Sequence, residues 1–369
     1  MKLYVIGDVT VDHMHFLNHI PKAGEDIVPQ QSALLPGGAG GTMAFHAANL
    51  GHTVTLAARV GNDPFATVAL ENLVRSGVSQ SALQYDAQTM TSTVTILVTG
   101  EERTMISPNG ANRLLDPALL EKKLLEGQDA LLISAYALIG GAQREYTQKA
   151  IEIAKKAGIP IFIDLGTGAV NVAGTSLLEW VLGADYLLMN QLELFRITGE
   201  SSISFALERL EALGLQTVVV KVGALGAILW TPKESELLEG YSVTNVVDTT
   251  GAGDAFSAAF AHGVLSAFAL PRAVAYANIA GAMATLAVGA QGTKLLHTDI
   301  LAKLEQYEAQ KAARVASKQT RSGKRVKPKD SPKPIPAAVE AKPTPAAIAP
   351  KPVVAVAEEP KKRGRKRAA

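Results

Sequence analysis

Short apolar runs alternate with longer helix-like segments along residues 1–300, and this alternation restricts the folds open to the chain. The clearest runs have the composition of strands that are buried on both faces of a parallel sheet. They lie at 54–57, 130–134, 159–164, 186–190 and 217–221, and helices are expected at about 64–76, 143–157 and 299–316. The alternation predicts an α/β fold with an open, mostly parallel sheet and helices on both of its faces.

The run Asp248-Thr249-Thr250-Gly251-Ala252-Gly253-Asp254 lies between a β-prone segment at 241–247 and an Ala/Phe-rich helical segment at 255–265. Its small residues are therefore expected at a helix N-terminus, where backbone N–H groups and the helix dipole hold an anion. Asp254 would repel this anion unless it has a chemical role. The role that fits is a base that takes a proton from a hydroxyl attacking a phosphate. A glycine-rich turn with an ordinary first-turn acid is the alternative.

Polar residues end or follow several of the predicted strands. Asn190 and Lys221 end two of the apolar runs, and Asp248 and Asp254 follow the β-prone segment 241–247. Ligands of open α/β sheets bind beyond the carboxyl ends of the strands. We therefore expect these four residues to converge on one crevice.

Composition excludes several kinds of site. The chain has no cysteine, which excludes disulfides, thiolate zinc sites and a cysteine nucleophile. We see no signal peptide, and no apolar run approaches the roughly 20 residues needed to cross a bilayer. These features predict a soluble, cytoplasmic protein with no membrane partner.

The net charge of +2 hides a division of the chain into two parts. Residues 311–369 hold 17 Lys and Arg against 4 Asp and Glu, which leaves 19 against 30 for residues 1–310. Half of the 18 prolines also lie in the last 59 residues. Such a segment cannot bury enough apolar surface to offset its ordering entropy. We predict a folded, acidic domain at 1–310 and a disordered, basic Lys/Pro/Ala-rich tail at 311–369.

Six motifs, in order along the chain, resemble those of the ribokinase-like, or PfkB, family of carbohydrate kinases. They lie at 5–12 (VIGDVTVD), 37–42 (GGAGGT), 190–193 (NQLE), 221–226 (KVGALG), 248–256 (DTTGAGDAF) and 277–292, where AN and GAQG occur. The resemblance covers about residues 1–304. It implies a ribokinase-like fold in which segments at about 13–36 and 89–106 form a small β-lid over the substrate. Some members dimerise through this lid, so a homodimer is one hypothesis.

The resemblance also implies ATP and Mg²⁺. The Gly251-Ala252-Gly253 run would cradle the transferred phosphoryl group, with Asp254 as the catalytic base. Asn190 and Glu193 would position Mg²⁺, largely through water. A helix cap with a first-turn acid is the alternative for these two residues.

Further positions resemble those that bind the nucleotide. They are Lys221, Gly223, Gly226 and, near the adenine, Asn278. A hairpin turn explains the two glycines equally well. Asp248 and Thr250 resemble positions whose backbone oxygens bind a monovalent cation such as K⁺.

On the substrate side, Asp12 is the first candidate, because an ionised acid accepts two hydrogen bonds from a diol. The Gly37-Gly38 pair would let the sugar lie against the backbone, and Thr42 and Arg103 would contact it. The chain departs from ribokinase proper, since Ala39 replaces the usual lysine and Thr42 the usual asparagine. The run 133–137 also lacks the acidic ligand that ribokinase carries there. The resemblance therefore does not imply ribose as the substrate.

The basic residues 361–367 (KKRGRKR) resemble an AT-hook core in which a lysine replaces the usual proline. Non-specific, salt-sensitive contact with nucleic acid through these residues is one hypothesis. A solubilising extension with no partner is the other.

The sequence thus predicts an ATP-dependent carbohydrate kinase, a phosphotransferase with an alcohol group as acceptor. The substrate would be a small sugar or sugar-like molecule. A nucleoside kinase of the same family is one alternative. A non-catalytic protein that associates with nucleic acid through its tail is another.

Overall fold

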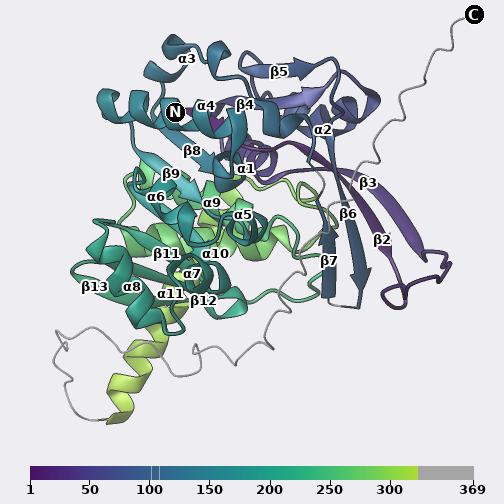
Figure 1. Ribbon diagram of the computed structural model, residues 1–369. Coiled ribbons are helices and arrows are strands. Elements are labelled where there is room, and N and C mark those ends of the chain that lie inside the picture. The colour runs from purple at the N-terminus through teal and green to yellow at the C-terminus, as the bar shows by residue number, and fades with distance from the viewer. Residues whose placement is uncertain (101, 108, 323–369) are drawn as a thin grey trace, which may run out of the picture.

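The computed structural model describes residues 1–100, 102–107 and 109–322 (Figure 1). Within these ranges nine strands form one sheet in the order β13-β12-β11-β10-β9-β8-β1-β4-β5, and four form another in the order β3-β2-β6-β7. The predicted tail beyond residue 322, with the basic run 361–367, lies outside the described residues.

The large sheet is mostly parallel. Its strands are β1 (Lys2–Ile6), β4 (Thr53–Gly61), β5 (Leu83–Asp86), β8 (Ala130–Ser134), β9 (Ile161–Asp164), β10 (Tyr186–Asn190), β11 (Val218–Lys221), β12 (Gly226–Thr231) and β13 (Glu234–Glu239). Only the neighbours β11–β12 and β12–β13 pair antiparallel among the described strands of this sheet. Each apolar run named from the sequence lies in one of these strands, so the predicted sheet is confirmed.

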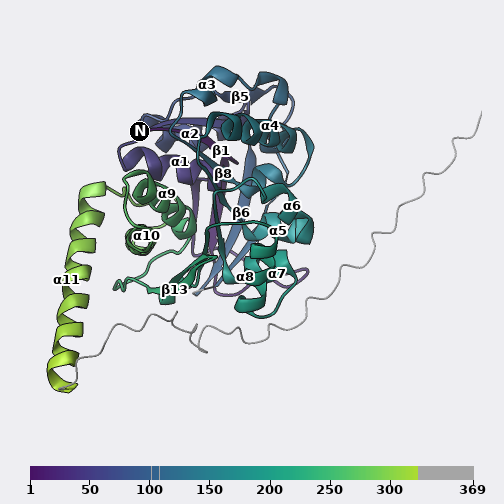
Figure 2. The ribbon, with the colours of Figure 1, turned by 90° about the vertical axis from the view of Figure 1, so that its left-hand side faces the viewer.

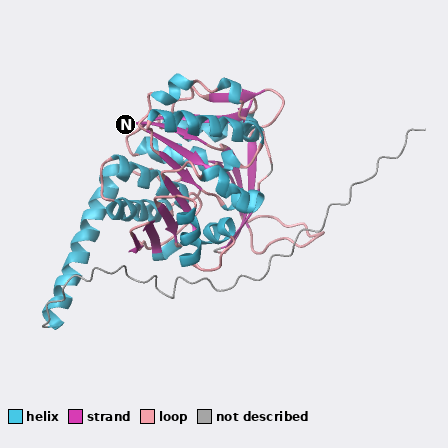
Figure 3. Cartoon of the chain, turned by 60° about the vertical axis from the view of Figure 1, so that its left-hand side comes forward, coloured by secondary structure: helices cyan, strands magenta, loops and turns pink. Residues whose placement is uncertain are grey.

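Helices cover both faces of the large sheet (Figure 3). They are α1 (Ala39–Asn49), α2 (Pro64–Arg75), α3 (Lys122–Glu126), α4 (Gly141–Ala157), α5 (Thr167–Ala173), α6 (Leu177–Val181), α7 (Gln191–Thr198), α8 (Ile203–Ala212), α9 (Ala252–Leu265), α10 (Leu270–Ala284) and α11 (His297–Ser322). Because side chains alternate along a strand, Leu3 and Val5 of β1 pack into the core that holds α1, α2, α9, α10 and α11. Tyr4 and Ile6 pack into the core that holds α3 to α8.

The small sheet projects from one side of this body (Figure 1), and we call it the lid. Its strands are β2 (Thr10–Phe16), β3 (Gln31–Gly37), β6 (Ser92–Thr99) and β7 (Glu102–Ile106). Met14 and its partner Ile96 are buried on one face, whereas Leu34 and Ile106 on the other face are about half exposed. The segments that the resemblance assigned to a lid therefore form a sheet with one exposed face.

Two expectations about the C-terminal half were wrong. The segment 241–247 is not a strand but an irregular loop, in which Asn245 has a left-handed φ of 63° and Val246 and Val247 are exposed. The described sheet ends at β13, and the segment 241–247 does not pair with that strand. Asp248 and Asp254 thus follow a loop rather than a strand.

The last helix is longer than expected. α11 runs from His297 to Ser322 and extends along the side of α9 and α10 (Figure 2). The helix was expected to end at about 316, so its last six residues, 317–322, extend it into the segment assigned to a disordered tail. Ala, Lys, Arg and Gln are strong helix formers, and the first proline after the helix begins is Pro328.

Candidate active site

A cavity of about 690 Å³ opens beyond the carboxyl ends of β9, β10 and β11, between the body and the lid. It brings together Asp12 of β2, Arg103 of β7, Lys221 of β11 and Asp254 of α9. The other predicted residues that line it are Gly38, Thr42, Asn190, Glu193, Gly223, Thr250, Gly251 and Gly253. Of the four residues expected to converge on one crevice, Asn190, Lys221 and Asp254 line this cavity, whereas Asp248 does not.

The N-terminus of α9 faces this cavity. Gly251 is its N-cap, with a left-handed φ of 77° that favours glycine. A Cβ at Gly251 would lie 2.6 Å from the Cα of Ala290, so no larger side chain fits without movement of the backbone. The helix runs for 14 residues from Ala252, and its dipole adds positive potential at this end. Backbone and dipole together make a site suited to an anion.

Asp254 lies in the first turn of α9, half-buried at the wall of the cavity. Burial raises its pKa well above the usual value, and the negative charge of Asp164 adds to this rise. The nearby ammonium of Lys221 acts in the opposite direction. A carboxyl with a raised pKa holds a proton more strongly, which suits a base that must take one from a hydroxyl.

Lys221 and Asp164 form a buried ion pair next to this helix end, with 2.6 Å between Nζ and Oδ1. Burial, the largest single influence, lowers the pKa of Lys221, but the carboxylates of Asp164, Glu193 and Asp254 together outweigh it and the pKa is raised. Burial raises the pKa of Asp164 to about 6 despite this partner. A Cβ built on Gly253 would lie 3.4 Å from Nζ, so the ammonium lies against the start of α9.

Asn190 and Glu193 form a capping box at the start of α7. The side chain of Asn190 accepts from the N–H of Glu193 at 2.8 Å, and Glu193 Oε2 accepts from the N–H of Asn190 at 2.8 Å. Glu193 Oε1 also accepts from the hydroxyl of Thr167 at 2.9 Å. The helix-cap alternative is thus correct as local structure. Both residues still line the cavity, so capping does not remove them from the site.

Asp12 lies at the other end of the cavity, only 5 % exposed. Burial raises its pKa to about 6, while a hydrogen bond from Thr10 opposes the rise. A Cβ on Gly37 would lie 2.3 Å from Asp12 Oδ1, so Gly37 leaves space for this carboxylate. Thr42 is fully buried on α1, and its hydroxyl has no partner among the described residues.

Arg103 reaches from the lid to the loop before α9. Its guanidinium lies 2.8 Å from Asp248 Oδ1 and also bonds to the hydroxyl of Thr249. Asp248 Oδ1 accepts from the N–H and the hydroxyl of Thr250, and Oδ2 accepts from Gly289 N–H at 2.7 Å. The Asp248 side chain therefore organises the loop that precedes the helix and connects it to the lid.

The fold and these motifs agree with comparisons against known proteins. The family model described as "pfkB family carbohydrate kinase" matches residues 1–297. The chain belongs to the PfkB family of carbohydrate kinases. It is an ATP-dependent sugar kinase.

Individual relatives support this assignment. The chain is 30% identical to a ribokinase of Bacillus subtilis over 78% of its own length and 94% of the relative. It is 29% identical to a deoxyribokinase of Salmonella typhi over 71% of its own length and 85% of the relative. The structure of a Vibrio cholerae fructokinase in its fructose, ADP and calcium ion bound form superposes with a TM-score of 0.70 at 27% identity. That match covers 82% of this chain and 98% of the fructokinase.

Two predicted nucleotide-binding residues of this sugar kinase lie outside the cavity. A Cβ on Gly226 would lie 2.0 Å from the carbonyl oxygen of Leu238, so this glycine is explained by the close approach of β12 and β13. Asn278 of α10 donates from Nδ2 to the carbonyls of Leu238 and Glu239, both at 3.2 Å. Gly226 thus permits the close pairing of β12 with β13, and Asn278 joins α10 to β13.

Three cavity residues were not assigned a role from the sequence. Asp164 ends β9 as Asn190 ends β10, and this signal alone could have identified it. Asp8 accepts from the N–H groups of Ala39 and Gly40, at 3.2 and 3.3 Å. Tyr136 accepts from a backbone N–H through its hydroxyl, and its ring packs where the Cβ atoms of Gly166 and Gly168 would be. Asp8 lies in the motif at 5–12 and follows the end of β1, so the same signal could have identified it, whereas no local pattern marks Tyr136.

No helix among the described residues is both long enough and apolar enough to cross a membrane.

Proposed function

We propose that Asp254 is the general base of this sugar kinase and that the Gly251-Ala252-Gly253 turn holds the transferred phosphoryl group. One observation carries the proposal: Asp254 and the start of α9 share a cavity with Asp12 on one side and Lys221 on the other. A hydroxyl between Asp12 and Asp254 would face a phosphate at the helix N-terminus. Its proton passes to Asp254 while the oxygen attacks the γ-phosphorus of ATP, the bond from that phosphorus to the bridging oxygen breaks, and ADP leaves.

Lys221, Gly223 and the capping box serve the nucleotide side of the proposed mechanism. The ammonium of Lys221 lies against the helix end and adds to its positive potential, which opposes charge repulsion as phosphates approach. Gly226 and Asn278 support the adenine side through β13 rather than by lining the cavity.

The residues present fit Mg²⁺ held mainly by water and phosphate. No group of three or more acidic or histidine side chains that could hold a metal occurs among the described residues. The carboxylate of Glu193 is already occupied by the capping box and by Thr167. Mg²⁺ gives up its water shell reluctantly and uses few carboxylates in phosphate sites. Asn190 and Glu193 would orient its water ligands, and the ion would neutralise phosphate charge.

A monovalent cation such as K⁺ fits the loop around Asp248. The Asp248 carboxylate is fully used by Arg103, Thr250 and Gly289, so the backbone oxygens of Asp248 and Thr250 are the remaining donors. The hydroxyl of Thr293, in the same connection as Gly289, is buried without a partner among the described residues. Activity measured with K⁺ and with a large organic cation in its place tests this site.

On the sugar side, Asp12 accepts hydroxyl hydrogen bonds, Gly37 leaves space for its carboxylate, Gly38 offers backbone, and Thr42 supplies an unpartnered hydroxyl. Arg103 closes the site, with its Nε buried and without a partner among the described residues.

The nucleoside alternative keeps one specific observation in its favour. The same cavity has an apolar wall of Val94, Ile96, Met105, Tyr136 and Ile139, which would suit a nucleobase.

The deciding experiment measures ADP release from ATP and Mg²⁺ across a panel of sugars, sugar acids and nucleosides. Wild type and Asp254→Asn run side by side. We expect release with one substrate class, and a loss of about a thousandfold or more in kcat for the variant with nucleotide binding retained. Wild-type turnover by Asp254→Asn would refute the base, and release with nucleosides only would favour the alternative.

Two further proposals concern assembly. The exposed apolar residues Leu34 and Ile106, which lie in one cross-strand row on the same face of the lid, suit a homodimer interface. Sedimentation of wild type and Leu34→Asp tests it. Nucleic-acid contact through residues 361–367 is tested by gel retardation with full-length protein and with protein ending at residue 322.

A further inference from the structure

The β6–β7 hairpin of the lid joins the body through two connections. We call residues 86–91, which lead into β6, the entry foot, and residues 109–116, which follow β7, the exit foot. Ser92, at the start of β6, lines the active-site cavity, as do Asn109, Asn112 and Arg113 of the exit foot. The position of the two feet therefore sets part of the substrate end of the site.

Asp86 holds the entry foot. Its Oδ1 accepts from the backbone N–H groups of Gln88 and Thr89, at 2.9 and 2.7 Å. Its Oδ2 accepts from Arg59 of β4, at 2.7 Å from Nη2 and 3.1 Å from Nε. The backbone N–H groups, and then Arg59, lower the pKa of Asp86 to about 2, so the carboxylate stays ionised at neutral pH.

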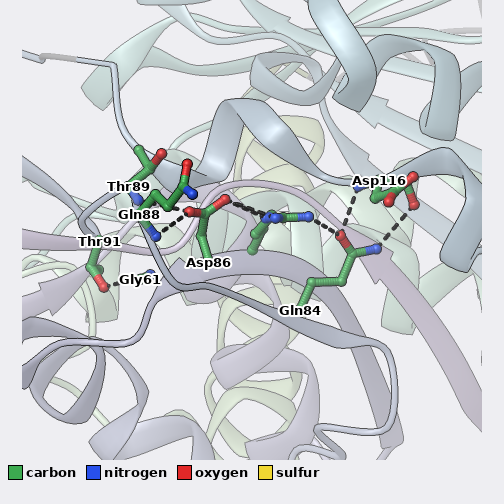
Figure 4. A network of polar contacts seen from close by, with 8 residues as sticks. Gly61, Gln84, Asp86, Gln88, Thr89, Thr91 and Asp116 are labelled. Atoms are coloured by element: carbon green, nitrogen blue, oxygen red, sulfur yellow. Dashed lines mark hydrogen bonds and ion pairs between the residues drawn. The ribbon is translucent and has the colours of Figure 1, made fainter.

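Gln84 holds the exit foot. Its Oε1 accepts from the N–H of Asp116 at 2.7 Å, and its Nε2 donates to the carbonyl of Asp116 at 3.1 Å. Arg59 Nη1 also donates to Gln84 Oε1, at 3.3 Å, so one guanidinium joins both holding side chains. Figure 4 shows Gln84 and Asp86 side by side, with dashed lines to Asp116 and to the backbone at Gln88 and Thr89.

The feet are also joined to each other and to the body. The N–H of Ala111 donates to the carbonyl of Met90 at 2.9 Å, and the hydroxyl of Ser92 donates to Asn112. The hydroxyl of Thr91 accepts from Gly61 N–H at 3.0 Å. A shift at one foot must therefore move the other or break these bonds.

We infer that Arg59, Gln84 and Asp86 form a clamp that positions the sugar-binding end of the cavity and the hairpin that carries Arg103. None of the three lines the cavity, so they act through the feet as positioning residues. Gln84 and Asp86 are each only 7 % exposed, and a buried polar group that loses its partner is costly. The inference rests on the proposed sugar phosphorylation.

Two clamp variants test this, with a matched control elsewhere. Gln84→Met removes the bonds to Asp116 at nearly constant volume, and Asp86→Asn places an amide against Arg59. Glu308→Gln alters a similar two-pronged arginine pair, Arg272–Glu308, between α10 and α11. KM and kcat are measured for ribose, deoxyribose or fructose, whichever the wild type uses best, and for ATP.

We expect each clamp variant to raise the KM for the sugar about tenfold while the KM for ATP changes less than about twofold. Glu308→Gln should change neither. Equal effects on both KM values, or wild-type values in a variant that remains folded, would overturn the inference. If Asp86→Asn does not fold, the KM values of Gln84→Met for the sugar and for ATP decide the test.

Hydrogen exchange separates failure of the clamp from failure of the proposed function. The amides of Gln88, Thr89 and Asp116 should exchange about tenfold faster in the clamp variants than in wild type. Unchanged exchange refutes the clamp even if no sugar is phosphorylated. Faster exchange with an unchanged sugar KM refutes its role in positioning the site.

Discussion

The large sheet and the lid contribute to the active site in different ways. The body supplies Asp164, Lys221 and Asp254, which are packed among one another so that burial and neighbouring charges shift their pKa values. The lid supplies Asp12 and Arg103 from a sheet with one exposed face. Burial raises the pKa of Asp12 to about 6 as well, so shifted pKa values occur in both regions. The two regions differ in how their groups are held: those of the body pack against one another, whereas those of the lid depend on the position of the lid.

The largest effect expected from this difference is on the pH dependence of catalysis. A base must be ionised, so kcat/KM should fall as the pH drops through the raised pKa of Asp254, by about tenfold per pH unit. This acid limb should lie above that of an ordinary carboxyl, near pH 4. Asp12, whose pKa burial raises to about 6, would add to this limb when the sugar binds, so the limb is also measured in Asp12→Asn, where the part due to Asp254 should remain. An acid limb near pH 4 in that variant, as for an ordinary carboxyl, would contradict the assignment.

The Lys221–Asp164 ion pair of the body should contribute to the free energy of unfolding. Lys221→Met leaves Asp164 without its cation, and we expect a loss of roughly 2 kcal/mol in the free energy of unfolding, moderated by protonation of Asp164. Denaturant unfolding measures it. Lys149→Met breaks the exposed Lys149–Glu145 pair, which has a similar length of 2.8 Å, and should change little. Equal losses would show that burial is not the cause.

The lid arginine should affect binding more than folding. Arg103→Gln removes the charged contact with Asp248, which keeps its bonds to Thr250 and Gly289. We expect the KM for the sugar to rise about tenfold with a small change in the unfolding midpoint. Arg75→Gln, in an exposed pair with Glu71, serves as the control. A lowered stability with an unchanged KM would make Arg103 a structural residue.

The smallest effect concerns a row of histidines in the body. His52 Nε2 and His262 Nδ1 lie 2.9 Å apart, as do His262 Nε2 and His297 Nδ1. Burial lowers the pKa of His52 to about 4, and the N-terminal ammonium adds to this. His52 is protonated near pH 6.5 in the unfolded chain but only near pH 4 in the folded chain. The free energy of unfolding therefore falls as the pH drops from about 6.5 toward 4.

His52→Gln should weaken this dependence. Between about pH 7.5 and 5.5 the wild type should lose about 1 kcal/mol more than the variant. Unfolding midpoints at the two pH values measure the difference, and Lys149→Met again provides the control. Equal losses of stability in wild type and His52→Gln would show that folding does not lower the pKa of His52.

Local sequence predicted the features that depend on the residues of a single strand, helix or turn. The apolar runs predicted the strands of the large sheet, and the small residues before Asp254 predicted a helix N-terminus. Asn190 and Glu193 have the spacing of a capping box, which sequence alone also allows. The prediction of a β-prone strand at 241–247 was wrong, because strand propensity takes effect only through pairing and this segment pairs with no described strand.

The sequence by itself determined the α/β class, the small-residue turn at a helix N-terminus and the acid that follows it, because these depend on residues close together in the chain. Tertiary structure alone decided that Asp164 pairs with Lys221, that Asp8 and Tyr136 enter the cavity, and that Gly226 and Asn278 support β13 instead. It also decided the contacts of Arg103 and the clamp at Asp86. Each of these joins residues far apart in sequence, and the shifted pKa values follow from burial that only packing creates.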